Sequence, residues 1–259
     1  MHKGRLKQCV TTGVFRGANM NLDEMSRHAA ELGCYGFDLI GPKDWPILKK
    51  YGLVPTMMPP PWGGTISDGV NEKGNHDRLE KTTHEAIDLC AAAGAPNVIV
   101  MSGNRRGMKD DVGAGNCVEF LHKVKKHAED KGILLQMELL NSKVDHKDYM
   151  CDHATWGIDV MKRVESPNVK LLYDIYHMQI MDGDIVRTIR ENIVHFGHFH
   201  TGGNPGRHEI DDTQELNYHV VAKAIADAGF TGQVAHEYTP AAGNDALKSL
   251  EAALKICEV

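Results

Sequence analysis

No two cysteines in this sequence stand close enough together to suggest a metal knuckle or a redox motif. The 259 residues contain six cysteines, with no C-x-x-C or similar spacing among them. Several lie in apolar segments, such as Cys90 in an alanine-rich stretch. We therefore expect buried, reduced thiols of a cytoplasmic protein and not a disulfide framework.

Long apolar runs and an excess of positive charge are also missing. The sequence has no apolar run of about 18 residues, the length typical of a transmembrane helix, and its N-terminus has no secretory hydrophobic region. With 29 basic and 35 acidic residues, the formal net charge is −6, so the chain as a whole lacks the basic character of a nucleic-acid-binding protein. We therefore expect no membrane and no nucleic acid among its partners, and a cytoplasmic location.

What the sequence does have is a regular alternation of strand-like and helix-like segments. Apolar or mixed runs predict eight strands near residues 6–12, 35–40, 53–58, 97–102, 133–138, 169–174, 193–200 and 233–237. Helices are expected near residues 21–31, 44–51, 77–93, 116–131, 152–164, 182–191, 216–228 and 245–257. Strands alternating with helices favour a parallel sheet. Eight such units predict an α/β fold, a (β/α)8 TIM barrel in which residues 1–259 form a single domain.

Four expected strands in the second half of the chain end in a side chain that can bind a divalent metal. These side chains are Glu138, Asp174, His200 and Glu237. In a barrel the carboxyl ends of the strands open on one face, so the four should meet. Clustered carboxylates repel one another unless a cation neutralises them. We predict one divalent metal ion here, Mg²⁺ or Mn²⁺ by ligand type, although Zn²⁺ and Co²⁺ also accept such ligands.

The two glutamates can serve in acid/base chemistry as well. Two carboxylates on opposite sides of a substrate allow one to remove a proton while the other delivers one. A metal that chelates a carbonyl and the neighbouring hydroxyl would stabilise the enediolate between these steps. The hypothesis is that Glu138 and Glu237 are the catalytic pair for proton transfer next to the carbonyl of a small-molecule substrate.

Two further side chains are candidates for substrate binding. His177 follows Asp174 by three residues and could donate to a substrate oxygen. The Pro205-Gly206 pair predicts a turn that aims Arg207 back over the barrel mouth, where a guanidinium can pair with substrate oxygens. The alternative for Arg207 is an ion pair with an acidic residue of its own loop, Glu209 or Asp211.

Two weaker candidates lie in loops on the same face. Glu209 could orient Arg207 or His200. Trp62 follows a run of three prolines, and it could either form an apolar lid over the metal or simply pack within its loop.

Five segments together resemble the xylose isomerase-like TIM-barrel superfamily of sugar isomerases and epimerases, and its hydroxypyruvate isomerase-like members most closely. They are CVTTGVF at 9–15, MELLNSK at 137–143, LLYDIYHMQ at 171–179, NPGRHE at 204–209 and HEY at 236–238. The resemblance implies a metal bound by Glu138, Asp174, His200 and Glu237. It also implies catalysis by Glu138 and Glu237, with His177 and Arg207 at the substrate. One departure is His200, where hydroxypyruvate isomerases typically carry Gln and the ketose 3-epimerase branch carries His.

The leading hypothesis is therefore a metal-dependent isomerase of the aldose–ketose type. The named candidate reaction converts hydroxypyruvate to 2-hydroxy-3-oxopropanoate (tartronate semialdehyde). The same-fold alternative is a ketose 3-epimerase or another sugar isomerase or epimerase. More distant alternatives are a metal nuclease of the endonuclease IV type, which would need about three zinc ions and a basic groove, and a non-catalytic sugar-binding protein. A homo-oligomer is compatible with all of these hypotheses.

Overall fold

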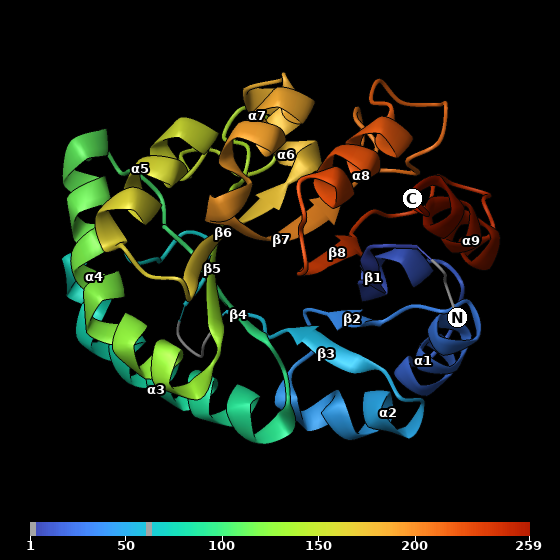
Figure 1. Cartoon of the computed structure of the whole chain (residues 1–259), viewed down its shortest axis with the longest axis horizontal. Coiled ribbons are helices and arrows are strands. Elements are labelled where there is room, and N and C mark those ends of the chain that lie inside the picture. Colours follow the sequence, from blue (N-terminus) through green and yellow to red (C-terminus); the bar gives the residue numbers. More distant parts are fainter. Residues whose placement is uncertain (1–3, 61–63) are drawn as a thin grey trace.

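Eight parallel strands form the inner ring of the computed structural model, which describes residues 4–60 and 64–259 (Figure 1). The strands are β1 Lys7–Val10, β2 Gly36–Asp38, β3 Val54–Met57, β4 Asn97–Val100, β5 Leu134–Glu138, β6 Val169–Asp174, β7 Phe196–Thr201 and β8 Gln233–His236. Their spatial order is β3-β2-β1-β8-β7-β6-β5-β4. Backbone bonds around Met58 join the two ends of this order, since its N–H donates to Asn97 O at 2.9 Å and its carbonyl accepts from Ile99 N at 3.1 Å. The predicted (β/α)8 barrel is confirmed.

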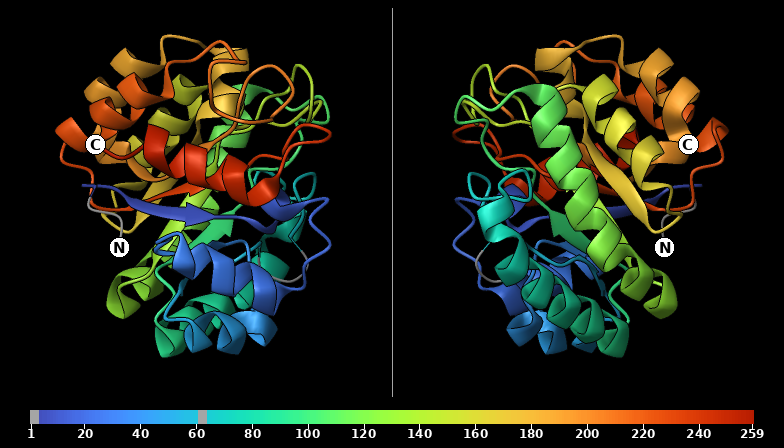
Figure 2. Two further views of the ribbon diagram at one scale, coloured as in Figure 1. Left: turned by 90° about the vertical axis from the view of Figure 1, so that its right-hand side faces the viewer. Right: turned by 90° about the vertical axis from the view of Figure 1, so that its left-hand side faces the viewer.

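Helices surround this ring on its outer side, as the two side views show (Figure 2). In the described residues the α-helices are α1 Leu22–Glu31, α2 Trp45–Lys50, α3 His76–Ala93, α4 Asp110–Lys131, α5 Ala154–Val164, α6 Ile175–Met181, α7 Ile185–Asn192, α8 Tyr218–Asp227 and α9 Ala246–Ile256. Short 3-10 turns are η1 Thr12–Phe15, η2 Pro42–Asp44, η3 Lys73–Asn75 and η4 Ile193–His195. None of the helices that the structure describes combines the length and the apolar character that crossing a membrane requires.

Local signals explain where several helices begin and end. At the start of α1 the Asn21 side chain accepts from Glu24 N at 3.0 Å, while the Glu24 carboxylate accepts from Asn21 N at 2.8 Å. This reciprocal pair satisfies two backbone donors that the first turn of a helix leaves free. At their other ends, α3 and α4 stop at glycines in the left-handed region, Gly94 with φ 77° and Gly132 with φ 68°.

The structure differs from the expected elements in three places. Helix α4 begins at Asp110, six residues before the predicted start at 116. Its extra turns contain Gly113, which normally suggests a loop, but a Cβ built there would lie 2.0 Å from Met150 Sδ. Any larger residue at this position would force the Met150 side chain to move. The short helix α6 directly after β6 was not predicted as a separate element, and residues 193–195 form η4 instead of the start of β7.

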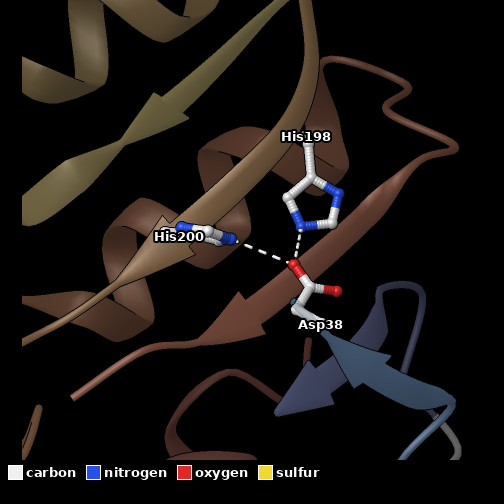
Figure 3. Close-up of side chains that lie close together, drawn as sticks. All are labelled: Asp38, His198 and His200. Carbon is white, nitrogen blue, oxygen red and sulfur yellow. Dashed lines mark hydrogen bonds and ion pairs between the residues drawn. The ribbon is translucent and has the colours of Figure 1, made fainter. Parts of the chain in front are cut away.

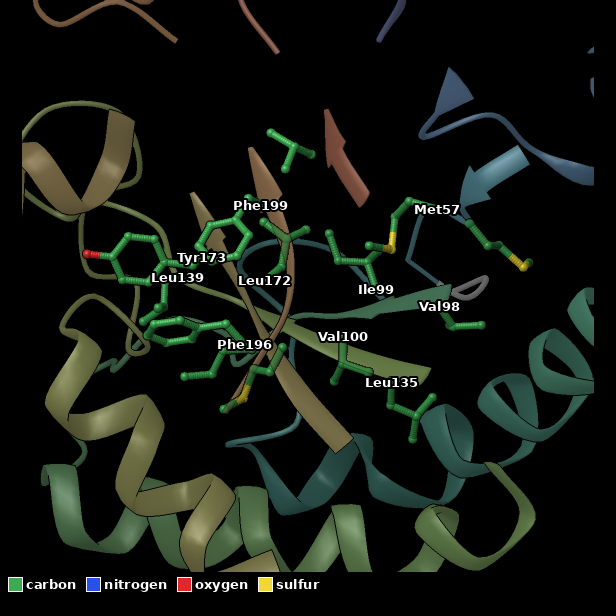
Figure 4. Close-up of a cluster of buried hydrophobic side chains, with 14 of the residues drawn as sticks. Met57, Val98, Ile99, Val100, Leu135, Leu139, Leu172, Tyr173, Phe196 and Phe199 are labelled. Carbon is green, nitrogen blue, oxygen red and sulfur yellow. The ribbon is translucent and has the colours of Figure 1, made fainter. Parts of the chain in front are cut away.

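The core is one large cluster of buried apolar side chains contributed by strands and helices. Buried apolar side chains such as Ile99, Leu172 and Phe199 belong to one hydrophobic cluster (Figure 4). A buried amide chain also crosses between strands: Gln136 Nε2 donates to Asn97 Oδ1 at 2.9 Å, and Asn97 Nδ2 donates to Gln233 Oε1 at 3.0 Å. Burial of large apolar side chains stabilises the fold by about 1.5–3 kcal/mol for each one. All six cysteines are buried and free, as expected.

Candidate metal and catalytic site

The four strand-end side chains predicted to bind a metal come together at one end of the barrel. Glu138 ends β5, Asp174 ends β6, His200 is the penultimate residue of β7, and Glu237 directly follows β8. In the register of β6 and β7, Asp174 is paired with His200. One ligand atom from each of the four lies within 4.8 Å of the others. The expected meeting of these four residues is confirmed.

This cluster places three carboxylates in a largely buried space. The side chains of Asp174 and His200 have an exposed fraction of 0%, against 7% for Glu138 and 23% for Glu237. Such a group needs compensating positive charge, because the carboxylates have lost most of their hydration. Part of it comes from Arg207, whose Nη2 donates to Asp174 Oδ2 at 2.6 Å and to Glu237 Oε2 at 2.8 Å.

Behind His200 lies a buried carboxylate that we did not predict as part of the site. Asp38, the last residue of β2, accepts from His200 Nε2 at 3.0 Å and from His198 Nε2 at 2.6 Å through the same oxygen (Figure 3). A signal was present in the sequence, since residues 198 and 200 lie on the same face of a strand. No sequence pattern indicated that Asp38, which precedes His198 by 160 residues in the chain, would lie against that face.

The bond to Asp38 decides which ring nitrogen of His200 faces the carboxylates. A carboxylate only accepts, so His200 donates through Nε2 and a neutral ring carries its lone pair on Nδ1. Nδ1 lies 2.6 Å from Glu237 Oε2 and 3.5 Å from Glu138 Oε1, and no hydrogen-bond partner satisfies it among the residues that the structure describes.

A divalent cation fits this set of donors. Three carboxylates and one imidazole nitrogen, with a fourth carboxylate holding the far side of the ring, are typical of metal sites in proteins. Burial alone would lower the pKa of His200, but the nearby charge of Glu237 and the bond to Asp38 raise it well above its ordinary value. The position in front of Nδ1 therefore attracts positive charge, either a proton or a metal ion.

The two glutamates of the cluster differ in their electrostatics. Burial raises the pKa of Glu138, and the neighbouring His200 ring opposes this shift without cancelling it. Burial acts in the same direction on Glu237, but the charges of His200 and Arg207 outweigh it and lower the pKa. The environments thus push the two pKa values apart, which is a pattern found where one carboxyl group acts as acid and another as base.

Arg207 and His177 lie side by side next to this cluster. Gly206 and Arg207 adopt positive φ values of 93° and 56°, and the resulting turn brings Arg207 back over the strand ends. Arg207 contacts Asp174 and Glu237 there, so the alternative of an ion pair within its own loop does not hold. His177 lies in the first turn of α6, where its N–H donates to Asp174 Oδ1 at 3.1 Å, and its Nε2 is 3.1 Å from Arg207 Nη1.

The structure bears differently on the two weaker candidates. Glu209 bonds to the loop before α9 and not to Arg207 or His200: its carboxylate accepts from Ala241 N at 3.0 Å and from Asn244 Nδ2 at 2.9 Å. The suggestion that it orients the site is therefore wrong in this structure, and Glu209 holds a loop in place. Trp62 lies outside the described residues.

A cavity of about 550 Å³ adjoins the cluster between the loops that follow β1, β7 and β8. Its lining includes Thr11, Arg16, Leu39, Arg207 and Glu237. This volume is within the usual range for small-molecule sites.

Comparison with known proteins decides the family. The family model described as "Xylose isomerase-like TIM barrel" matches residues 27–256. The chain belongs to this family. The match spans strands β2 to β8 and therefore includes all four members of the candidate metal cluster.

Curated relatives of this xylose isomerase-like TIM barrel protein are similar to it at a moderate level. A 2-oxo-tetronate isomerase from Haemophilus influenzae is 28% identical over 230 residues, which cover 82% of this chain and 85% of that protein. A human protein named "Putative hydroxypyruvate isomerase" is 29% identical over 175 residues. That match covers 64% of this chain and 62% of the human protein, which is less than two thirds of its length.

Two solved structures are similar to this chain over nearly their whole length. A structure titled as an AP endonuclease, family 2, from Brucella melitensis has a TM-score of 0.84 and 26% sequence identity, and the alignment covers 95% of this chain and 96% of that one. A D-psicose 3-epimerase from Clostridium cellulolyticum H10 has a TM-score of 0.78 at 18% identity, covering 98% and 100%. The second likeness concerns the fold alone.

Proposed function

We propose that this protein is a metal-dependent isomerase of small hydroxy-carbonyl compounds. One observation carries the proposal: the imidazole nitrogen Nδ1 of His200 faces the carboxylates of Glu138, Asp174 and Glu237 within one buried cluster. Acceptor atoms that face one another in this way are stabilised by positive charge between them, and a divalent cation can supply it. The cluster lies beside a cavity of small-molecule size, where a bound cation can meet a substrate.

The roles of the residues follow from their positions. A divalent ion held by Glu138, Asp174, His200 and Glu237, with Mg²⁺ or Mn²⁺ preferred by the ligand types, would supply a Lewis acid that polarises a substrate carbonyl. One glutamate of the pair Glu138 and Glu237 removes a proton from the carbon that bears the substrate hydroxyl. The electron pair left on carbon forms the double bond of an enediolate, and the other glutamate returns a proton to the former carbonyl carbon. The hydroxyl proton moves to the other oxygen, so the isomer has the same atoms as the substrate.

The substrate class is a 2-oxo acid with a hydroxyl group next to the carbonyl. Hydroxypyruvate, which would give 2-hydroxy-3-oxopropanoate, and 2-oxo-tetronate are the candidates that the names of the relatives support. Both molecules carry a carboxylate, and Arg207 beside Glu237 offers a guanidinium that binds carboxylates well.

An activity panel tests the proposal. Purified protein is assayed with hydroxypyruvate, 2-oxo-tetronate and several ketoses, after EDTA treatment and again with added Mg²⁺ or Mn²⁺. We expect turnover of a 2-oxo acid that EDTA abolishes and metal restores. Absence of turnover of every hydroxy-carbonyl compound with metal present would refute the proposal.

A ketose 3-epimerase is the second candidate, because an imidazole stands at the β7 position of the cluster. The same metal and the same glutamate pair would serve that reaction. Deuterium from solvent distinguishes the two: an epimerase exchanges the proton at C3 and leaves the carbonyl in place, whereas the isomerase moves the carbonyl.

A metal nuclease is a weaker candidate, although one similar structure carries such a title. In residues 4–60 and 64–259 only two clusters of three or more metal-ligand side chains occur, and both use His200. A three-zinc site needs more ligands than these, and the net charge of −6 does not favour DNA binding. We expect no cleavage of DNA with an abasic site.

A further inference from the structure

The side chain of Asn141 touches the ring of His177 in the interior of the site. Asn141 lies three residues after Glu138, and its Nδ2 is 2.6 Å from His177 Nδ1. Both side chains are fully buried. Because water does not reach this contact, the hydrogen-bond direction between the two groups is determined by the protein alone.

Three other bonds fix the orientation of the Asn141 amide. Its Oδ1 accepts from the backbone N–H groups of Val144 at 3.0 Å and Asp145 at 2.9 Å. Its Nδ2 donates to Asp145 Oδ2 at 2.6 Å. A flipped amide would place its oxygen against the Asp145 carboxylate and its NH₂ group against two N–H donors. The amide therefore donates to His177, and His177 Nδ1 is an acceptor.

The opposite nitrogen of His177 must then carry the proton. A neutral imidazole has one donor and one acceptor, so Nε2 is the N–H side. Nε2 lies 3.1 Å from Arg207 Nη1, and a guanidinium also donates only. The nearest carboxylate oxygen that the structure records for Nε2 is Asp174 Oδ2, at 3.7 Å. Two N–H groups thus converge, and the part of the chain that the structure describes places no acceptor between them.

Neighbouring contacts hold both donors in this arrangement. Arg207 Nη2 is bound by Asp174 and Glu237, which leaves Nη1 on the side of His177. The Tyr176 ring lies 5.2 Å from the guanidinium carbon of Arg207, and the centres of the Tyr176 and His177 rings are 5.1 Å apart. The paired donors are therefore a fixed feature of the site, and a ligand oxygen placed between them would satisfy both.

We propose that Asn141 is a positioning residue that holds His177 in the Nε2–H tautomer, so that His177 and Arg207 donate together to one substrate oxygen. The identity of the substrate rests on the proposed function, whereas the tautomer does not. The oxygen that fits two donors is one that only accepts, such as a carbonyl, carboxylate or enediolate oxygen. A hydroxyl oxygen fits if its own proton points elsewhere.

The variant that tests this proposal reverses one hydrogen bond at constant charge. In the double variant N141D/D145N the amide and the carboxylate exchange places, so the bond between positions 141 and 145 is kept in the opposite direction. Residue 141 then accepts from His177 Nδ1, and His177 becomes the Nδ1–H tautomer with an acceptor facing Arg207. D145N alone is the matched control, because it removes the same carboxylate but leaves the Asn141 donor in place.

The tautomer is measured directly by ¹⁵N–¹H correlation of the histidine rings, with the signals of His177 identified by their loss in H177Q. We expect Nε2–H in the wild type and in D145N, and Nδ1–H in N141D/D145N, in protein treated with EDTA and in protein with Mg²⁺. An Nδ1–H tautomer in the wild type, or an unchanged tautomer in the folded double variant, would overturn the proposal. This result does not depend on whether any substrate is turned over.

Kinetics then test the consequence for the substrate. With the best substrate of the panel, N141D/D145N should lose about 10²-fold in kcat/KM, the size of effect seen when one oriented donor is removed. In an H177A background the same double change should have little further effect, since the donor that it reorients is already gone. A loss of the same size in the H177A background would show that Asn141 acts through the fold and not through His177.

Discussion

His200 shows how a single side chain combines two duties at the centre of the site. Its Nε2 is held by Asp38 and its Nδ1 faces Glu237, so one ring nitrogen fixes the orientation while the other is offered to a cation. The position of His200 at a strand end predicted that its ring would face a metal ion. The hydrogen bond to Asp38 was not predicted, because Asp38 comes from β2 at the other end of the chain.

A substitution at Asp38 tests the importance of that partner. In D38N the amide no longer offers a charged acceptor to His200 and His198, so the ring is held less firmly. We expect the affinity for Mn²⁺ to fall by about 10- to 100-fold, measured by calorimetric titration. D159N, which changes an exposed carboxylate on α5, should leave the affinity unchanged. Equal affinities of D38N and wild type would contradict the assigned role of Asp38.

Substitutions of the two glutamates test the proton-transfer pair. E138Q and E237Q keep the size of each side chain but remove its ability to exchange a proton at neutral pH. Each should lower kcat by about 10²- to 10⁴-fold, the range ascribed to a positioned acid or base, while circular dichroism remains that of the wild type. Near-normal turnover in either folded variant would rule out the two-carboxylate mechanism.

At the scale of elements, the strands were predicted more completely than the helices around them. Runs such as 133–138 and 169–174 are apolar, buried and bounded by turn residues, and their predicted ends agree with β5 and β6. The start of α4 was missed because Gly113 packs against Met150, a tertiary contact that local propensity cannot show. Helix α6 was missed because its seven residues are too few for a helical period to be recognised.

The capping box of α1 gives a test at this scale. N21A removes the side chain that accepts from Glu24 N, and the free energy of unfolding should fall by about 1 kcal/mol. N21D keeps an equivalent cap and should stay close to the wild type. Chemical denaturation of the three proteins measures the difference. A destabilisation of N21D as large as that of N21A would argue against the cap as the cause.

On the scale of the whole molecule, the barrel explains why residues so far apart in sequence form one site. Ligand candidates from β5 to β8 follow from a parallel ring, and this part of the site could be predicted once eight β/α units were recognised. The contacts that orient these side chains could not be predicted from the sequence. Asp38 behind His200 and Asn141 beside His177 depend on side-chain geometry that no spacing encodes.

The burial of all six thiols gives a whole-molecule prediction. Burial raises the pKa of Cys34, Cys90 and Cys257 to about 12, so little thiolate is present at pH 8. The folded protein should react with a thiol reagent such as DTNB far more slowly than the unfolded protein, which should release six equivalents of product. Rapid reaction of several thiols in the native protein would contradict the packed barrel described above.

The proposed function depends on a divalent metal ion held by four strand ends of one barrel. Anomalous scattering from crystals of the protein grown with Mn²⁺ locates such an ion. We expect one strong anomalous peak bounded by Glu138, Asp174, Glu237 and Nδ1 of His200, with Asp38 still bonded to the other nitrogen of that ring. Absence of a peak there at saturating Mn²⁺, or binding of the ion only elsewhere, would refute the proposed metal site.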